Sequence, residues 1–221
     1  MNEAAEQVRK DRFGLVLLSI LLAILTSAAA GATEWGRILT VVLLGGTTIL
    51  ILRTTEARPR YRLAAAIVVG LAVAVTTASV ILGDSELSEW AIPTVGALLA
   101  VGAPVAIARR LGHHRTVTLQ TVLGALSLYL LAGMFFAFVY NAVAALSDEP
   151  FFSGLNEASS IDYLYFSFVT LATVGYGDLT AATDLGRMLA VTEGLTGQLY
   201  LVTVVALLVS NLGRARRLRD D

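Results

Sequence analysis

Long apolar runs separated by short polar stretches dominate the hydrophobic pattern of this chain. Six runs stand out, at residues 13–30, 38–52, 63–83, 90–108, 117–146 and 188–212. A helix that crosses a bilayer needs about 20 mostly apolar residues, so each run predicts a transmembrane helix. The second run is short and needs flanking residues that reach the interface, whereas the fifth is long enough to tilt or protrude.

Composition supports a membrane protein. Of the 221 residues, 56% are hydrophobic and only 15% are charged, whereas soluble domains average about 25% charged residues. The absence of cysteine excludes disulfides, thiolate metal sites and cysteine nucleophiles. The first run follows Arg9, Lys10 and Arg12 and could instead be a secretory signal, but its apolar part exceeds the usual length of about 7 to 15 residues.

Basic residues collect at alternate ends of the apolar runs. They are Arg9, Lys10 and Arg12, then Arg53, Arg58, Arg60 and Arg62, then Arg109, Arg110 and Arg115, and finally Arg214, Arg216, Arg217 and Arg219. Only Arg37 and Arg187 lie in the opposite connections, which are acidic. The positive-inside rule therefore predicts that both termini lie in the cytoplasm. We expect a multi-pass protein of the plasma membrane, surrounded by lipid.

A short helical pattern lies between the last two runs. Ser159 is a candidate N-cap with Asp162 three residues later, and residues 161–172 continue without a helix breaker. Twelve residues at about 1.5 Å each span roughly 18 Å, which is enough to enter a bilayer but not to cross it. We therefore expect a re-entrant half-helix.

The half-helix leads directly into Thr173-Val174-Gly175-Tyr176-Gly177-Asp178. Non-helical backbone at membrane depth is tolerated where it is covered by protein or lines an aqueous cavity. Gly175 and Gly177 can adopt positive φ, which a backbone with successive carbonyls pointing the same way requires at alternate positions. These residues are therefore expected to border a pore.

This segment resembles the selectivity filter of potassium channels, which has the signature Thr-Val-Gly-Tyr-Gly. The resemblance implies K⁺ as the permeant ligand, with no other cofactor, held by the carbonyl oxygens of the filter and by the Thr173 hydroxyl. The carbonyls belong to Thr173, Val174, Gly175 and Tyr176, and Gly177 completes the filter. The side chains of Val174 and Tyr176 are expected to point away from the ions and pack against the half-helix.

One chain supplies one filter strand, whereas the family uses four, so the resemblance implies a homotetramer. The expected fold is an all-α membrane protein with six transmembrane helices, a re-entrant pore helix and a filter loop, arranged with four-fold symmetry around a central pore. We divide the chain into a sensor-like domain at 1–115, a pore domain at 116–213 and a cytoplasmic tail at 214–221. No nucleic-acid partner is expected.

The half-helix departs from the family at two places. Tyr165 and Phe166 stand where many relatives have a tryptophan pair, which preserves ring packing but changes the hydrogen bonding behind the filter. Val169 stands where some bacterial relatives have a glutamate, so that carboxylate link to Asp178 is absent. We expect Asp178, Thr170, Tyr165 and Phe166 to support the filter.

Glu193 is the one ionisable residue well inside any of the six runs. An intramembrane acid is a functional candidate by default. Our hypothesis is that it supports the half-helix through Ser167 or Thr170 and that its protonation alters conduction, although a static buried hydrogen bond is an equal alternative.

The last run also carries candidate gating residues. Gly197 matches the hinge position of the family, but close helix packing through a small residue explains it equally well. Leu201, Val205 and Val209 recur every four residues and are candidates for the cavity wall. Ordinary packing of an apolar helix would explain the same spacing.

The fourth run lacks the arginines of a voltage sensor. None lies within 90–108, and Arg109 and Arg110 lie only at its end. Working sensors move three or four charges per subunit, each worth about 2.3 kcal/mol per 100 mV, so we expect a sensor-like domain that does not respond to voltage. His113 and His114 in the following connection can titrate near neutral pH, but such a pair is more often simply solvated.

These features predict a channel that passes K⁺ down its electrochemical gradient. The alternatives are a weakly selective cation channel and a nonconducting scaffold or receptor subunit. An intramembrane enzyme is disfavoured because no histidine lies inside a run and Glu193 alone does not make a catalytic site.

Overall fold

The described residues of the chain form helices joined by short connections. The computed structural model describes residues 13–30, 34–54, 59–82 and 119–220. Its elements are α2 (Phe13–Ala30), α3 (Glu34–Thr54), α4 (Pro59–Leu82), α6 (Leu119–Ala145), α7 (Ser160–Leu171) and α8 (Asp184–Asp220). The prediction of an all-α fold is therefore confirmed for this part of the chain. The predicted fourth span at 90–108 lies outside the described residues.

The helices follow the apolar runs but differ from them at their ends. The first run coincides with α2, whereas α3 and α4 begin four residues before the second and third runs. The last helix, α8, begins at Asp184 and continues to Asp220, so it includes residues 214–220 of the predicted tail. Apolar runs mark the part of a helix that contacts lipid or core, while the helices continue beyond them into flanking residues such as Arg37 and Arg60.

Among the described residues, the helical stretch Gln120–Ala145 is long and apolar enough to cross a bilayer. Shorter apolar helical stretches lie at Phe13–Ser27, Val41–Leu52 and Leu63–Ala78. The number of six spans therefore stays a prediction.

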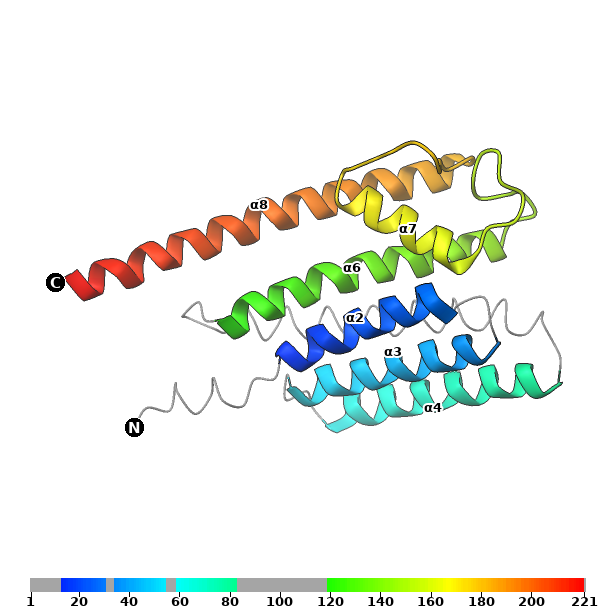
Figure 1. Cartoon of the computed structure of the whole chain (residues 1–221), viewed down its shortest axis with the longest axis horizontal. Coiled ribbons are helices and arrows are strands. Elements are labelled where there is room, and N and C mark those ends of the chain that lie inside the picture. Colours follow the sequence, from blue (N-terminus) through cyan, green and yellow to red (C-terminus); the bar gives the residue numbers. More distant parts are fainter. Residues whose placement is uncertain (1–12, 31–33, 55–58, 83–118, 221) are drawn as a thin grey trace.

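Figure 1 shows two groups of helices side by side. The consecutive helices α2, α3 and α4 lie next to one another with alternating chain direction, and α2 packs against α6. The short helix α7 contacts both α6 and α8 at one end of the bundle, and α8 continues far beyond it at the other end (Figure 1). The segment after α7 returns to the end of the bundle where α7 begins, so α7 enters the bundle without crossing it.

An apolar core joins the first helices to α6. Its buried residues are Phe13, Val16, Ile20, Ala23, Leu44, Ile51, Leu131 and Met134. Apolar side chains from three helices meet there. Lipid tails are as apolar as these side chains, so close packing rather than the exclusion of water holds such helices together in a bilayer. This core fixes α6 against the N-terminal helices.

A second core holds the start of α7 and consists largely of aromatic rings. We call it the outer aromatic cluster, and its members include Phe136, Tyr140, Phe151, Phe152, Tyr163 and Phe166. Phe151 and Phe152 meet edge to face with ring centroids 4.9 Å apart, and Phe152 and Phe166 do so at 5.2 Å. Such pairs contribute about 0.5 to 1.5 kcal/mol beyond area burial, so the cluster fixes α7 against α6 and the preceding loop.

Candidate functional site

A reciprocal cap fixes the beginning of α7. The backbone N–H of Asp162 donates to Ser159 Oγ at 3.4 Å, and the backbone N–H of Ser159 donates to Asp162 Oδ2 at 2.7 Å. This arrangement satisfies two backbone donors that a helix start otherwise leaves unpaired. The predicted short helix with Ser159 as N-cap is confirmed, and it ends at Leu171 with Ala172 as C-cap.

The backbone after α7 alternates in conformation. The φ angles of Thr173, Gly175 and Gly177 are +56°, +57° and +80°, so the predicted positive φ at both glycines is confirmed. Thr173 carries a Cβ, and the left-handed region costs such a residue roughly 1 to 2 kcal/mol. Positive φ at every second residue is the pattern expected if successive carbonyls are to point the same way.

Side chains of this segment are exposed in the single chain. Val174 is 51% exposed and Tyr176 is 72% exposed. Within the single chain both side chains therefore lie largely on the surface, and their packing against the half-helix stays a prediction.

Tyr165 and Asp178 connect α7 to the residue that follows the filter motif. The Tyr165 hydroxyl donates to Asp178 Oδ2 at 2.8 Å, and this hydrogen bond raises the pKa of Tyr165 above its ordinary value. The bond joins the two sides of residues 173–177. Phe166 belongs to the outer aromatic cluster, and the Thr170 carbonyl accepts a hydrogen bond from the backbone N–H of Thr173 at 2.9 Å.

The segment beyond Asp178 is tied to the loop before α7. The backbone N–H of Ser153 donates to the Thr180 carbonyl, and that of Ala182 donates to the Phe151 carbonyl, both at 2.9 Å. These bonds hold the residues that follow Asp178, while the Tyr165 hydroxyl holds Asp178 itself.

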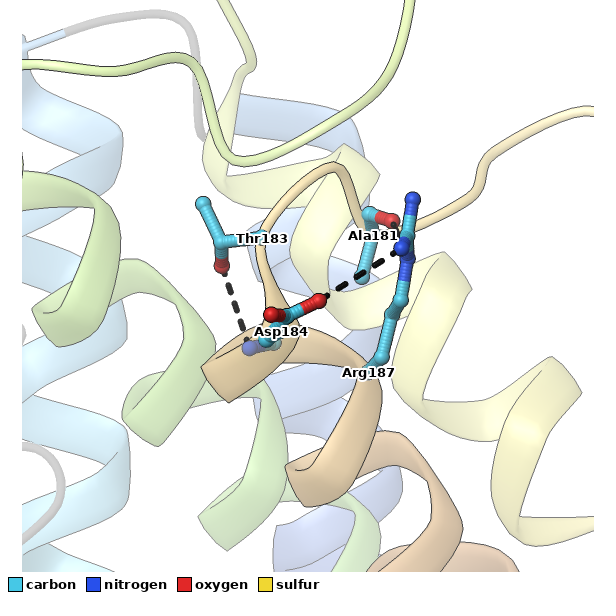
Figure 2. A network of polar contacts seen from close by, with 5 residues as sticks. Ala181, Thr183, Asp184 and Arg187 are labelled. Carbon is cyan, nitrogen blue, oxygen red and sulfur yellow. Dashed lines mark hydrogen bonds and ion pairs between the residues drawn. The ribbon is translucent and has the colours of Figure 1, made fainter.

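Figure 2 shows how α8 begins. The Thr183 hydroxyl accepts a hydrogen bond from the backbone N–H of Gly186 at 3.1 Å and so caps the helix. Arg187 donates from Nε to the Ala181 carbonyl at 3.2 Å and approaches Asp184 at 3.6 Å (Figure 2). Since both side chains of this ion pair are largely exposed, it contributes little energy but helps direct the chain into α8.

Glu193 is fully buried where three helices meet. Its Oε1 lies 2.5 Å from Ser167 Oγ on α7, and its Oε2 accepts from the Tyr140 hydroxyl on α6 at 2.5 Å. Of the two partners named from the sequence, Ser167 makes this contact and Thr170 does not. Sequence reasoning missed Tyr140, although a tyrosine within the apolar run of α6 signals a hydroxyl that needs a partner.

Gly197 allows α8 to contact the end of α7. A Cβ at this position would lie 2.2 Å from the Leu171 carbonyl oxygen. The same carbonyl accepts a hydrogen bond from the Tyr129 hydroxyl at 3.2 Å, and the Tyr129 ring packs on Tyr200 with centroids 5.8 Å apart. The helix α8 continues through Gly197, so the packing interpretation accounts for this glycine.

The other predicted residues fall at the limits of the description. Leu201 is 41% exposed on α8, whereas the side chains of Val205 and Val209 lie outside the described part. The same holds for Arg109, Arg110, His113 and His114. In the described ranges no three His, Cys, Asp or Glu side chains gather as a metal site.

Comparison with known proteins agrees with the motif. Residues 124–214 match the family described as "Ion channel". The predicted resemblance to the potassium channel family is confirmed. This match places the chain among membrane proteins and includes α7, the filter segment and most of α6 and α8.

Two plant proteins are similar to this chain over short stretches. The chain is 36% identical over 61 residues to Two-pore potassium channel 4 of Arabidopsis thaliana, which is 28% of this chain and 22% of that protein. It is 50% identical over 38 residues to Two pore potassium channel b of Oryza sativa subsp. japonica, which is 17% of this chain and 11% of that protein. No solved structure matches the chain significantly. The chain thus matches less than a quarter of the length of either relative.

Proposed function

We propose that this chain is the subunit of a potassium-selective channel that conducts K⁺ passively, without catalysing a reaction. The observation that carries the proposal is the alternating positive φ at Thr173, Gly175 and Gly177, directly after a capped half-helix. Carbonyls of Thr173, Val174, Gly175 and Tyr176 replace the hydration shell of the ion.

The direction of α7 adds to the electrostatics of this site. Its C-terminal end lies inside the bundle, next to the filter segment (Figure 1). The C-terminal end of a helix carries a partial negative charge of about one half of an elementary charge. Four such ends around a cavity would stabilise a cation that has lost part of its water.

We propose a homotetramer because the resemblance implies four filter strands, and the surface of the single chain supports this assembly. Six exposed large apolar residues of α8 recur at intervals of three or four, which places them on one face. They are Leu185, Met188, Val191, Leu195, Leu199 and Val202, while the exposed Leu201 lies off this face. The residues that meet α6 and α7, such as Glu193 and Gly197, lie on the other side of the helix. Neighbouring subunits and lipid would cover the apolar face and the exposed Val174 and Tyr176.

Six spans, cytoplasmic termini and a voltage-insensitive sensor-like domain complete the proposal. They rest on the apolar runs, the positions of the basic residues and the absence of arginine within 90–108. A steep conductance change with voltage that is lost in Arg109→Gln would contradict the last point.

Reconstitution of the full chain into liposomes tests the function. We expect K⁺ flux, a reversal potential that follows the K⁺ gradient in mixed K⁺ and Na⁺, and a particle mass four times 23.4 kDa. Gly175→Ala is the matched control, since a Cβ at φ +57° is strained even where there is space for it. Equal K⁺ and Na⁺ permeability would indicate a weakly selective cation channel, and no flux would favour a scaffold or receptor subunit.

A further inference from the structure

Three side-chain groups and one backbone carbonyl form a buried chain of hydrogen bonds between α6, α7 and α8. Tyr140, Ser167 and Glu193 are each 0% exposed. Tyr140 OH contacts Glu193 Oε2, Glu193 Oε1 contacts Ser167 Oγ, and Ser167 Oγ contacts the Gly133 carbonyl oxygen. The chain joins α6 to α8, α8 to α7, and α7 back to α6.

The number of available protons determines the protonation state of the Glu193 carboxyl group. Ser167 Oγ lies 2.6 Å from Gly133 O and 2.5 Å from Glu193 Oε1, and oxygens this close need a proton between them. A serine hydroxyl has one proton, and a backbone carbonyl can only accept. Ser167 must therefore donate to Gly133, so the proton between Ser167 and Glu193 comes from Glu193. Tyr140 then donates to the remaining carboxyl oxygen.

We propose that Glu193 is a positioning residue that stays a neutral acid and donates its proton to Ser167, and that loss of this proton releases α7 and lowers conduction. This inference rests on the proposed function. The neutral acid makes the chain of hydrogen bonds complete, with each proton assigned to one donor and each contact satisfied.

No charged side chain of the described residues compensates a carboxylate here. The groups that act on the Glu193 carboxyl are the hydroxyls of Ser167 and Tyr140, and at longer range Glu193 interacts with the Tyr129 hydroxyl on α6. An ionised acid would leave Ser167 with two acceptors and one proton, so one of its two contacts would have to open. A buried charge without a partner is also unfavourable inside a membrane.

The position of Ser167 on α7 connects these hydrogen bonds to the filter. Ser167 lies one turn before Leu171, the last residue of α7. Opening the contact to Gly133 frees α7 to move away from α6 and moves Leu171, whose carbonyl the Tyr129 hydroxyl holds. The filter starts two residues later at Thr173, so a displacement of α7 reaches the ion-binding carbonyls.

Glu193→Gln separates the neutral form from the charged form. The amide Nε2 can donate to Ser167 and its oxygen can accept from Tyr140, so this variant reproduces the neutral acid without a titrating group. In liposomes we expect wild-type K⁺ flux to fall from neutral to alkaline pH with the slope of one proton per subunit, whereas Glu193→Gln conducts at all these pH values. Ser167→Ala should conduct about tenfold less at neutral pH, the typical effect of one lost buried hydrogen bond.

Infrared spectroscopy provides a readout that does not depend on conduction. Wild-type protein at neutral pH should show the carbonyl band of a protonated carboxyl group that Glu193→Gln lacks and that the exposed-residue control Glu149→Gln retains. Absence of that band overturns the assigned protonation even if the channel conducts. If the protein conducts no K⁺ but has the band, the proposed function fails and the neutral acid stands. A flux profile in Glu193→Gln that falls with pH as in the wild type overturns the link to conduction.

Discussion

Two glycines one turn apart on α8 provide a matched test of how α8 holds α7. A Cβ at Gly197 would lie 2.2 Å from the Leu171 carbonyl oxygen, 3.0 Å from Leu171 Cδ1 and 3.1 Å from its carbonyl carbon. At Gly194 the nearest atom, the Thr170 carbonyl oxygen, would lie 3.8 Å away. Only the first position lacks room for a methyl group.

The expected size of the effect follows from these distances. An ordinary carbon–oxygen contact is about 3.3 Å, so Gly197→Ala must move α8 and the end of α7 apart by roughly 1 Å. Overpacking of this kind destabilises by about 1 to 3 kcal/mol, and stretching the bond from Tyr129 to Leu171 adds about 1 kcal/mol. Alanine recovers about 1 kcal/mol of helix propensity at either site. The net destabilisation is about 1 to 3 kcal/mol for Gly197→Ala, whereas Gly194→Ala stabilises by up to about 1 kcal/mol.

Thermal unfolding in detergent and K⁺ flux in liposomes measure the two consequences. Gly197→Ala should unfold at a lower temperature than Gly194→Ala and should conduct less, since Leu171 ends the helix that leads into the filter. A hinge glycine would instead change channel opening and leave stability unchanged. If Gly197→Ala unfolds at the same temperature as Gly194→Ala, the close-packing explanation is refuted.

Three further substitutions test individual contacts. Tyr165→Phe removes the hydrogen bond to Asp178, which should cost about 0.5 to 1.5 kcal/mol and speed the decay of K⁺ current during sustained conduction. The control is Tyr163→Phe, which should leave the decay unchanged because the Tyr163 hydroxyl makes no hydrogen bond within the described residues. Ser159→Ala removes the cap of α7 and should lower the free energy of unfolding by about 1 kcal/mol, while unchanged stability in chemical denaturation would argue against the cap. Arg187→Gln should change stability by less than about 1 kcal/mol because its ion pair is exposed, and a larger loss would show that its bond to Ala181 matters more than expected.

Much of the helical arrangement and the filter segment could be read from local sequence. The apolar run at 13–30 coincides with α2, and the pair Ser159 and Asp162 predicted where α7 begins. Helix starts depend on side chains within one turn, and positive φ at Gly175 and Gly177 depends on the lack of a Cβ. Such signals act over a few residues, so they survive without knowledge of the fold.

Contacts between distant residues were decided by the tertiary structure. The sequence marked Glu193 as unusual but left Ser167 and Thr170 equally possible, and it did not indicate Tyr140, which lies 53 residues away along the chain. It also left open whether Gly197 bends or packs, which depends on how closely α8 approaches Leu171. The reason is physical: long apolar runs determine which segments form helices, whereas the depth and rotation at which helices meet depend on side-chain packing between them.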